Sequence, residues 1–209
     1  YLGFIDWAMR DKRVGTSYDP VKAYLFNAVF NDGSDIAIAL HSDFGSRAAA
    51  ETDAMRYAPR FGKMPAIYRQ NVSHLNVQKG GPSTTAHGHS QGHWITFYSD
   101  NATSRISTHD LEETSFHESS HASVQEYLIE GKEWLAAKAA DNKFVTEYAS
   151  EEVGEDFAES ALFAYTIINN PTRFPAADRT FIEKQIPNRI EYFRKLYNGQ
   201  PIPVPNVPS

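Results

Sequence analysis

Short apolar runs fill the first half of the chain, and each has the length expected for a buried strand. Residues 24–30 (YLFNAVF) and 36–40 (IAIAL) are two such runs, separated by the turn-forming sequence Asn31-Asp32-Gly33. Residues 71–77 and 94–98 (WITFY) have the same character. We therefore predict strands at these four places.

The segments around these runs follow other patterns. Residues 1–19 are mixed and aromatic, without a clear period. Residues 47–60 (RAAAETDAMRYAPR) have the composition of a helix, which Pro59 should end. Residues 79–93 are rich in glycine, serine and histidine, and this composition predicts a loop before the strand at residues 94–98.

The second half of the chain is predicted to be helical. A long helix opens near Asp110, which fits a capping box with Glu113, and it should run to about residue 129. Three shorter helices follow, over residues 132–140, 154–168 and 179–197. The last of them should be interrupted near Pro187, because proline removes a helical hydrogen bond.

This order of elements indicates an α+β fold, because strands precede helices instead of alternating with them. A chain of 209 residues can build one core or two tightly packed lobes, so we expect one domain over residues 1–198. The four prolines among residues 201–209 predict an extended tail over residues 199–209.

The composition excludes several kinds of site and partner. The chain has no cysteine, which excludes disulfides, cysteine-ligated zinc, iron–sulfur clusters and thiol catalysis. Its formal net charge of −6 argues against a nucleic-acid partner, which usually requires a basic excess. We also expect no membrane span, because no run of about 18 apolar residues occurs.

The sequence His117-Glu118-Ser119-Ser120-His121 lies inside the predicted long helix. Residues four apart share one helix face, so His117 and His121 can bind a single ion. Glu118 can reach a water on that ion and take its proton. This HExxH pattern binds zinc in metallopeptidases. The alternative is a solvated histidine and glutamate face that binds no metal.

Catalytic zinc takes three protein ligands and leaves one position for water. The acidic run over residues 151–159 offers candidates for the third ligand. On a helix, Glu152 would lie on an all-acidic face suited to water, whereas Glu155 would lie on a half-apolar stripe. Glu155 is therefore the predicted ligand. Glu159, one turn further on, can accept the second imidazole N–H of a ligating histidine.

The HExxH sequence and the sequence Glu155-Asp156-Phe157-Ala158-Glu159, which starts 34 residues after His121, together resemble the zincin metallopeptidases of the gluzincin type. They are most similar to the anthrax lethal factor-like catalytic domain family, where a helix with E-x-F-A-E supplies the glutamate ligand. The two motifs span roughly residues 110–165. The resemblance implies a zincin-like domain, with an N-terminal lobe of strands and helices, a mainly helical C-terminal lobe and a cleft between them.

The resemblance also implies roles for two other segments. The family places a tyrosine seven residues before the glutamate ligand, which is Tyr148 here, and its hydroxyl would stabilise the oxyanion. Otherwise Tyr148 is a core aromatic at a helix junction. The strand at residues 94–98 would be the edge along which an extended peptide binds.

We therefore expect a secreted zinc metalloendopeptidase that acts on a peptide or protein substrate. Zn²⁺ would be held by His117, His121 and Glu155, and Glu118 would be the general base. The secreted location follows from the relatives alone. Two alternatives remain, a zinc-binding or toxin-like module of the same fold that does not cleave, and a structural domain in which HExxH is accidental.

Several polar residues lie outside these motifs. His87, His89 and His93 form a second histidine cluster, which can bind a metal or border the site as a lid, although a flexible polar loop is favoured. Asn71 and Asn101 each begin a glycosylation sequon, a pattern that is common by chance.

Overall fold

The computed structural model describes residues 1–9, 20–81, 86–89 and 92–198. The chain divides into two compact units, Tyr1–Ser123 and Val124–Ser209. One mixed sheet together with helices confirms the broad α+β prediction. No helix in these ranges is long and apolar enough to cross a membrane. The predicted tail lies outside the described residues.

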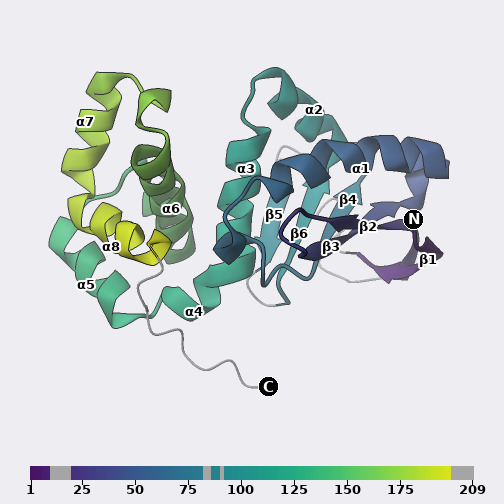
Figure 1. Ribbon diagram of the computed structural model, residues 1–209, viewed down its shortest axis with the longest axis horizontal. Coiled ribbons are helices and arrows are strands. Elements are labelled where there is room, and N and C mark those ends of the chain that lie inside the picture. The colour runs from purple at the N-terminus through teal and green to yellow at the C-terminus, as the bar shows by residue number, and fades with distance from the viewer. Residues whose placement is uncertain (10–19, 82–85, 90–91, 199–209) are drawn as a thin grey trace. The chain divides into compact units, whose positions relative to one another are not determined.

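Six strands form a single sheet in the described part of the first unit, in the order β1-β2-β3-β4-β6-β5 (Figure 1). β3 pairs in parallel with β4, and β4 with β6, while the remaining neighbours are antiparallel. The strands are β1 (Gly3–Ala8), β2 (Pro20–Val29), β3 (Asp35–His41), β4 (His74–Gln78), β5 (Ala86–His89) and β6 (Trp94–Tyr98).

The predictions of β2, β3, β4 and β6 are confirmed, but two strands were missed. β1 has no clear period, and β5 has four residues within the segment predicted to be a loop. The prediction that residues 94–98 form the sheet edge is therefore wrong. β6 lies between β4 and β5, and Gly88 of β5 pairs with Ile95, so β5 is the outer strand.

The helices of the first unit are α1 (Arg47–Gly62), α2 (Ser99–Ser107) and α3 (Leu111–Ser119), with single 3₁₀ turns η1 (Ser42–Phe44) and η2 (Ala66–Tyr68). α1 begins after Ser46, whose hydroxyl accepts from the N–H of Ala49. It continues through Pro59, contrary to the prediction. The carbonyl that loses its partner there belongs to Met55, which is exposed to water. α2 was not predicted.

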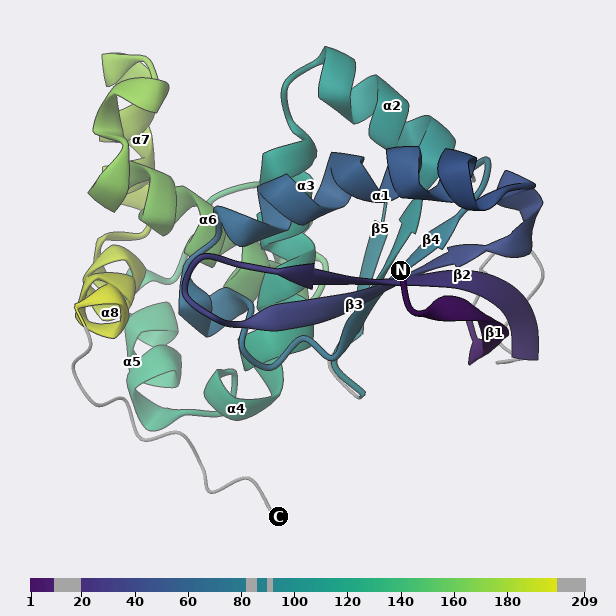
Figure 2. The same cartoon turned by 45° about the vertical axis from the view of Figure 1, so that its right-hand side comes forward.

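The helices of the first unit pack onto the sheet and onto one another (Figure 2). Tyr57 of α1 lies against Phe97 of β6, with ring centroids 4.9 Å apart. Phe116 of α3 packs on Tyr68, with centroids 4.4 Å apart, and α3 also contacts β5. These contacts fix α3 against the outer part of the sheet.

The predicted helix over residues 110–129 contains a change of helix type. α3 passes into a π-helical segment, η3 (Ser120–Gln125), which leads into α4 (Glu126–Leu128). The predicted capping box is wrong, because the side chain of Asp110 makes no cap bond. Its carboxylate instead accepts from Arg105 Nη1 at 2.7 Å and from Thr108 Oγ1 at 2.8 Å.

The second unit is helical throughout its described residues. Its longer helices are α5 (Lys132–Asp141), α6 (Val153–Asn169), α7 (Ala176–Gln185) and α8 (Pro187–Tyr197), with 3₁₀ turns η4 (Tyr148–Ser150) and η5 (Pro171–Arg173). Trp134 is fully buried, with its ring centroid 4.9 Å from that of Phe157 and 5.8 Å from that of Phe193. The predictions for α5 and α6 are confirmed, and α7 and α8 divide near Pro187 as expected.

Candidate metal centre

His117 and His121 lie on the face of the helical stretch that turns towards the interior. His117 is only 9% exposed, and its neighbours Phe116 and Ala122 are buried. These apolar residues pack the helical stretch against the core. The spacing of four residues places both histidines on one face of this stretch. This side of the helical stretch that carries HExxH is therefore largely shielded from solvent.

The Nε2 atoms of the two imidazoles lie 3.1 Å apart, with ring centroids 4.8 Å apart and the planes inclined by 74°. Two ring nitrogens at this distance either share one proton or direct both lone pairs at one cation. Nitrogens bound tetrahedrally to one zinc at the usual bond length stand about 3.3 Å apart. The pair therefore fits a metal with almost no movement.

Glu118 lies beside the outer strand of the sheet. Its carboxylate oxygen Oε2 accepts a hydrogen bond from the backbone N–H of Gly88 in β5. The N–H of Gly88 thus binds one of the two oxygens of this carboxylate. Glu118 is thus oriented by the backbone of a strand that the sequence did not predict.

The histidines of residues 79–93 have separate environments. The ring of His87 lies edge-on to that of Tyr98, with centroids 6.0 Å apart. His93 Nδ1 lies 2.7 Å from the carbonyl oxygen of Ala122, in the π segment. The side chain of His89 lies outside the described residues. No metal-binding group of three that includes His87 or His93 occurs among the residues that the structure describes.

Glu155 and Glu159 lie in the first half of α6, in the second unit. Glu155 is half-buried in the first turn, whereas Glu152 is exposed, as the sequence predicted. Glu159 Oε2 accepts a hydrogen bond from Thr146 Oγ1 at 2.9 Å. The carboxylate that the sequence predicted to orient a histidine therefore accepts a hydrogen bond from a threonine of the preceding loop.

Tyr148 begins the turn η4, seven residues before Glu155. The hydroxyl of Thr146 that binds Glu159 also accepts from the N–H of Ala149, at 3.0 Å. This hydroxyl therefore links α6 to the turn that carries Tyr148. Tyr148 itself is 46% exposed, so its interpretation as a core aromatic is wrong.

The start of α6 is anchored by a buried ionic network that the sequence analysis missed. Asp156 is fully buried, and its carboxylate binds Arg189 Nη2 at 3.1 Å and Lys138 Nζ at 3.3 Å. Burial raises the pKa of Asp156 despite these two cations. The run of acidic residues had suggested a solvated face around Asp156, and nothing in the pattern of α8 indicated that Arg189 is buried.

Comparison with known proteins adds no assignment to this picture. No family model, no curated protein and no solved structure matches the chain. The functional argument therefore depends on the residues and their geometry.

Proposed function

We propose that the protein is a zinc metallopeptidase that hydrolyses bonds of a peptide or protein substrate. The observation that carries the proposal is the 3.1 Å separation of the Nε2 atoms of His117 and His121, with Glu118 between them in the sequence. Glu155 is the proposed third ligand. The proposal of Glu155 rests on its match to the first position of the E-x-F-A-E motif and on its half-buried place in the first turn of α6.

The donor set suits zinc. Two neutral imidazoles and one carboxylate are a common catalytic zinc set, and they leave one coordination position for water. When bound there, zinc supplies the Lewis acidity that makes a water nucleophilic at neutral pH and polarises the scissile carbonyl. The absence of cysteine in the chain agrees with a set made of histidine and carboxylate ligands.

Glu118 and Tyr148 have the acid–base and hydrogen-bonding roles in this proposal. Glu118 takes a proton from the attacking water through the carboxylate oxygen that Gly88 does not bind, and later gives it to the leaving amine. Tyr148, whose side chain is exposed, donates a hydrogen bond to the oxyanion of the substrate. Thr146 steadies the turn that carries Tyr148.

We propose that the substrate binds in extended form along β5, the outer strand, and pairs with backbone groups of this strand other than the N–H of Gly88, which Glu118 binds. Main-chain pairing to a strand edge gives affinity with modest sequence preference, so the enzyme would act within chains of varied sequence. Secretion is proposed by analogy with the enzymes that the motifs resemble.

The test is cleavage of an unbiased peptide mixture, read by mass spectrometry. Zinc-loaded wild type is compared with Glu118→Gln, and with Glu126→Gln as a control that removes a carboxylate from the same helical stretch. We expect cuts from the wild type and the control, and a loss of about 10²–10⁴ in rate for Glu118→Gln with zinc retained. Cleavage by Glu118→Gln at the wild-type rate would contradict the proposed metallopeptidase with Glu118 as its general base.

Metal content separates the alternatives when no cuts are found. Stoichiometric zinc without cleavage would favour a binding module that does not cleave. Protein that takes up no zinc would favour an accidental HExxH sequence.

A further inference from the structure

The helical stretch changes from α to π at Ser120, directly before His121. π-helical segments are rare and occur frequently at functional sites. In such a segment the backbone N–H groups bond to carbonyls five residues back, so carbonyl groups at its end lose their α-helical partners. Buried carbonyls of this kind need another donor.

Two carbonyls of the π segment receive bonds from side chains outside the helix. His93 Nδ1 donates to the carbonyl of Ala122 at 2.7 Å, and Asn71 Nδ2 donates to the carbonyl of Ser123 at 3.0 Å. The hydroxyl of Ser123 in turn donates to the carbonyl of Ile67 at 2.7 Å. Ala122 and Ser123 are the two residues that follow His121, and both are buried.

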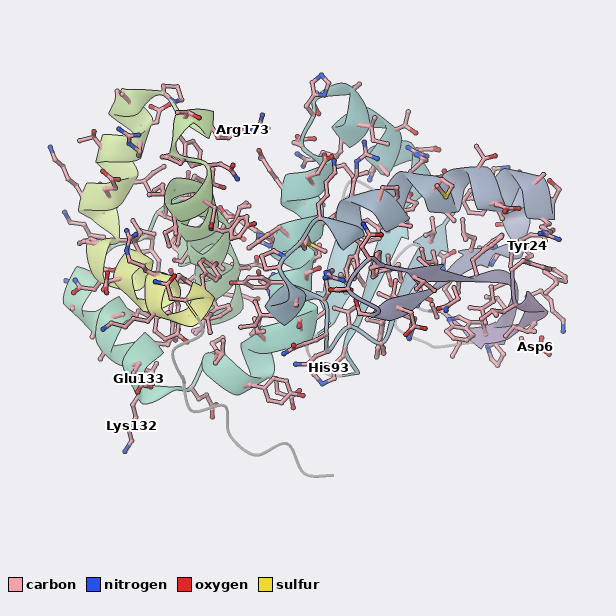
Figure 3. All side chains as sticks on the ribbon, viewed as in Figure 1. Asp6, Tyr24, His93, Lys132, Glu133 and Arg173 are labelled. Atoms are coloured by element: carbon pink, nitrogen blue, oxygen red, sulfur yellow. The ribbon has the colours of Figure 1, made fainter. Side chains whose placement is uncertain are left out.

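His93 is held in position for this bond. Its φ is 58°, in the left-handed region that non-glycine residues seldom adopt. The N–H and the hydroxyl of Ser73 both donate to its carbonyl, at 2.6 Å and 2.9 Å. A carbonyl can only accept, so the ring of His93 (labelled in Figure 3) carries its proton on Nδ1.

Asn71 and His93 come from two segments that precede neighbouring strands. Asn71 lies ahead of β4 and His93 directly ahead of β6, and these strands pair in parallel. The same end of the sheet therefore presents two donors to consecutive carbonyls of the helix. The side-chain amide nitrogen of Asn71 makes this contact. The contact gives Asn71 a structural role that does not depend on glycosylation.

We propose that His93 and Asn71 are positioning residues for the metal ligand His121. By binding the carbonyls of Ala122 and Ser123, they stabilise the π turn and hold the imidazole of His121 opposite that of His117. The inference rests on the proposed zinc site, and it assigns a role to a histidine that the sequence placed in a polar loop.

The test measures zinc affinity by competition with a chromogenic chelator, using zinc alone and no peptide substrate. His93→Gly removes the donor and keeps a residue suited to positive φ, whereas His93→Asn keeps both that backbone preference and a donor. Asn71→Leu removes the second donor. His109→Gly is the matched control, since His109 also has a positive φ, of 62°, but is exposed. Circular dichroism monitors folding.

We expect His93→Gly and Asn71→Leu each to weaken zinc binding by about tenfold or more, as for other residues that orient metal ligands. His93→Asn and His109→Gly should stay within about threefold of wild type on the same reasoning. Unchanged zinc affinity in folded His93→Gly and Asn71→Leu would overturn the inference, and so would equal losses in His93→Gly and His93→Asn.

Further outcomes separate this inference from the proposed function. A wild type that binds zinc but cuts no peptide would contradict the peptidase and leave the affinity comparison valid. A wild type that binds no zinc would overturn both. If His93→Gly failed to fold, Asn71→Leu would decide the matter. Unfolding of both variants would refute a positioning role, because the bonds would then hold the fold itself.

Discussion

The backbone of Gly88 lies directly against the side chain of His121. A Cβ built on Gly88 would stand 2.7 Å from the Cβ of His121 and 2.2 Å from the carbonyl oxygen of Glu118. Contacts this short do not occur between unstrained atoms, so β5 can approach the HExxH helix only because residue 88 has no side chain. The sheet and the candidate site are thus fitted together at this glycine.

Gly88→Ala should destabilise the first unit by about 1–3 kcal/mol or more, because the obstructing atoms include helix backbone that cannot move alone. The free energy of unfolding of the zinc-free protein in urea measures this. Gly62→Ala is the control. Its Cβ would meet the Phe30 ring at 2.8 Å, but a side-chain ring can rotate away, so we expect a clearly smaller loss. Equal losses would contradict the argument.

Tyr148→Phe should lower kcat by about 10²–10³, the effect of removing one oxyanion donor elsewhere. KM and zinc content should not change, and stability should change little because the side chain is 46% exposed. The measurement is steady-state kinetics on a peptide found in the cleavage test. Tyr165→Phe removes a hydroxyl from a half-buried tyrosine of α6 and serves as the control. An unchanged kcat in Tyr148→Phe would remove this residue from the mechanism.

Arg189→Met should destabilise the protein by about 3–5 kcal/mol, because it leaves buried carboxylates without their main cation. Arg189 is 1% exposed, and it binds Asp156 at 3.1 Å and the carbonyl of Lys143 at 2.6 Å. Equilibrium unfolding in urea measures the loss.

Arg194→Met makes the same substitution on the same helix, where Arg194 pairs with Glu191 at the surface at 3.3 Å. Exposed pairs of this kind contribute about 0–1 kcal/mol, so the control should be nearly neutral. Adding Asp156→Asn to Arg189→Met should recover part of the stability. Similar losses in the two arginine variants would show that the buried network matters no more than a surface pair.

The stability of the first unit should fall as the pH drops from about 6.5 towards 4. Burial lowers the pKa of His74 to about 4, since its ring lies between Trp7 and Trp94 at centroid distances of 5.2 Å and 5.9 Å. An unfolded histidine has a pKa of about 6.5, so in this window only the unfolded chain gains the proton. The contribution is complete above pH 6.5 and is lost towards pH 4.

The loss attributable to His74 at pH 4.5 is about 2–3 kcal/mol at most. His74→Phe keeps an aromatic ring and has no proton to gain, so its stability should fall less than that of wild type between pH 7 and pH 4.5. Both proteins are measured in urea with a chelator present, which removes any contribution from metal loss. Parallel pH profiles for the two proteins would contradict the role of His74.

The helices of the second half could be predicted from the sequence because their signals are local. α5 and α6 follow from composition and from the sequence around their ends, and the i,i+4 spacing predicts that His117 and His121 share one helix face. The exposure of Glu152 and the shielding of Glu155 also followed from their neighbours on the helix. These features need no information about distant residues.

The features that the sequence did not reveal depend on tertiary contacts. β5 has a glycine and two histidines among its four residues, so it is a strand only because β6 pairs with it. The π segment depends on Asn71 and His93, which lie 52 and 29 residues from the carbonyls they bind. Asp110 lost its predicted cap because Arg105 and Thr108 bind its carboxylate.

The bond between Glu118 and Gly88 also affects how the protein should behave at high concentration. An outer strand with free N–H groups is a template for pairing with another molecule. The carboxylate of Glu118 occupies one such group on β5, the N–H of Gly88, and so a strand of another molecule cannot pair with the full length of β5. Glu118→Ala would uncover that N–H, whereas Glu118→Gln keeps an amide oxygen to accept from it. Inactive protein for co-crystallisation with peptides should therefore carry glutamine, because the alanine form is the one expected to self-associate.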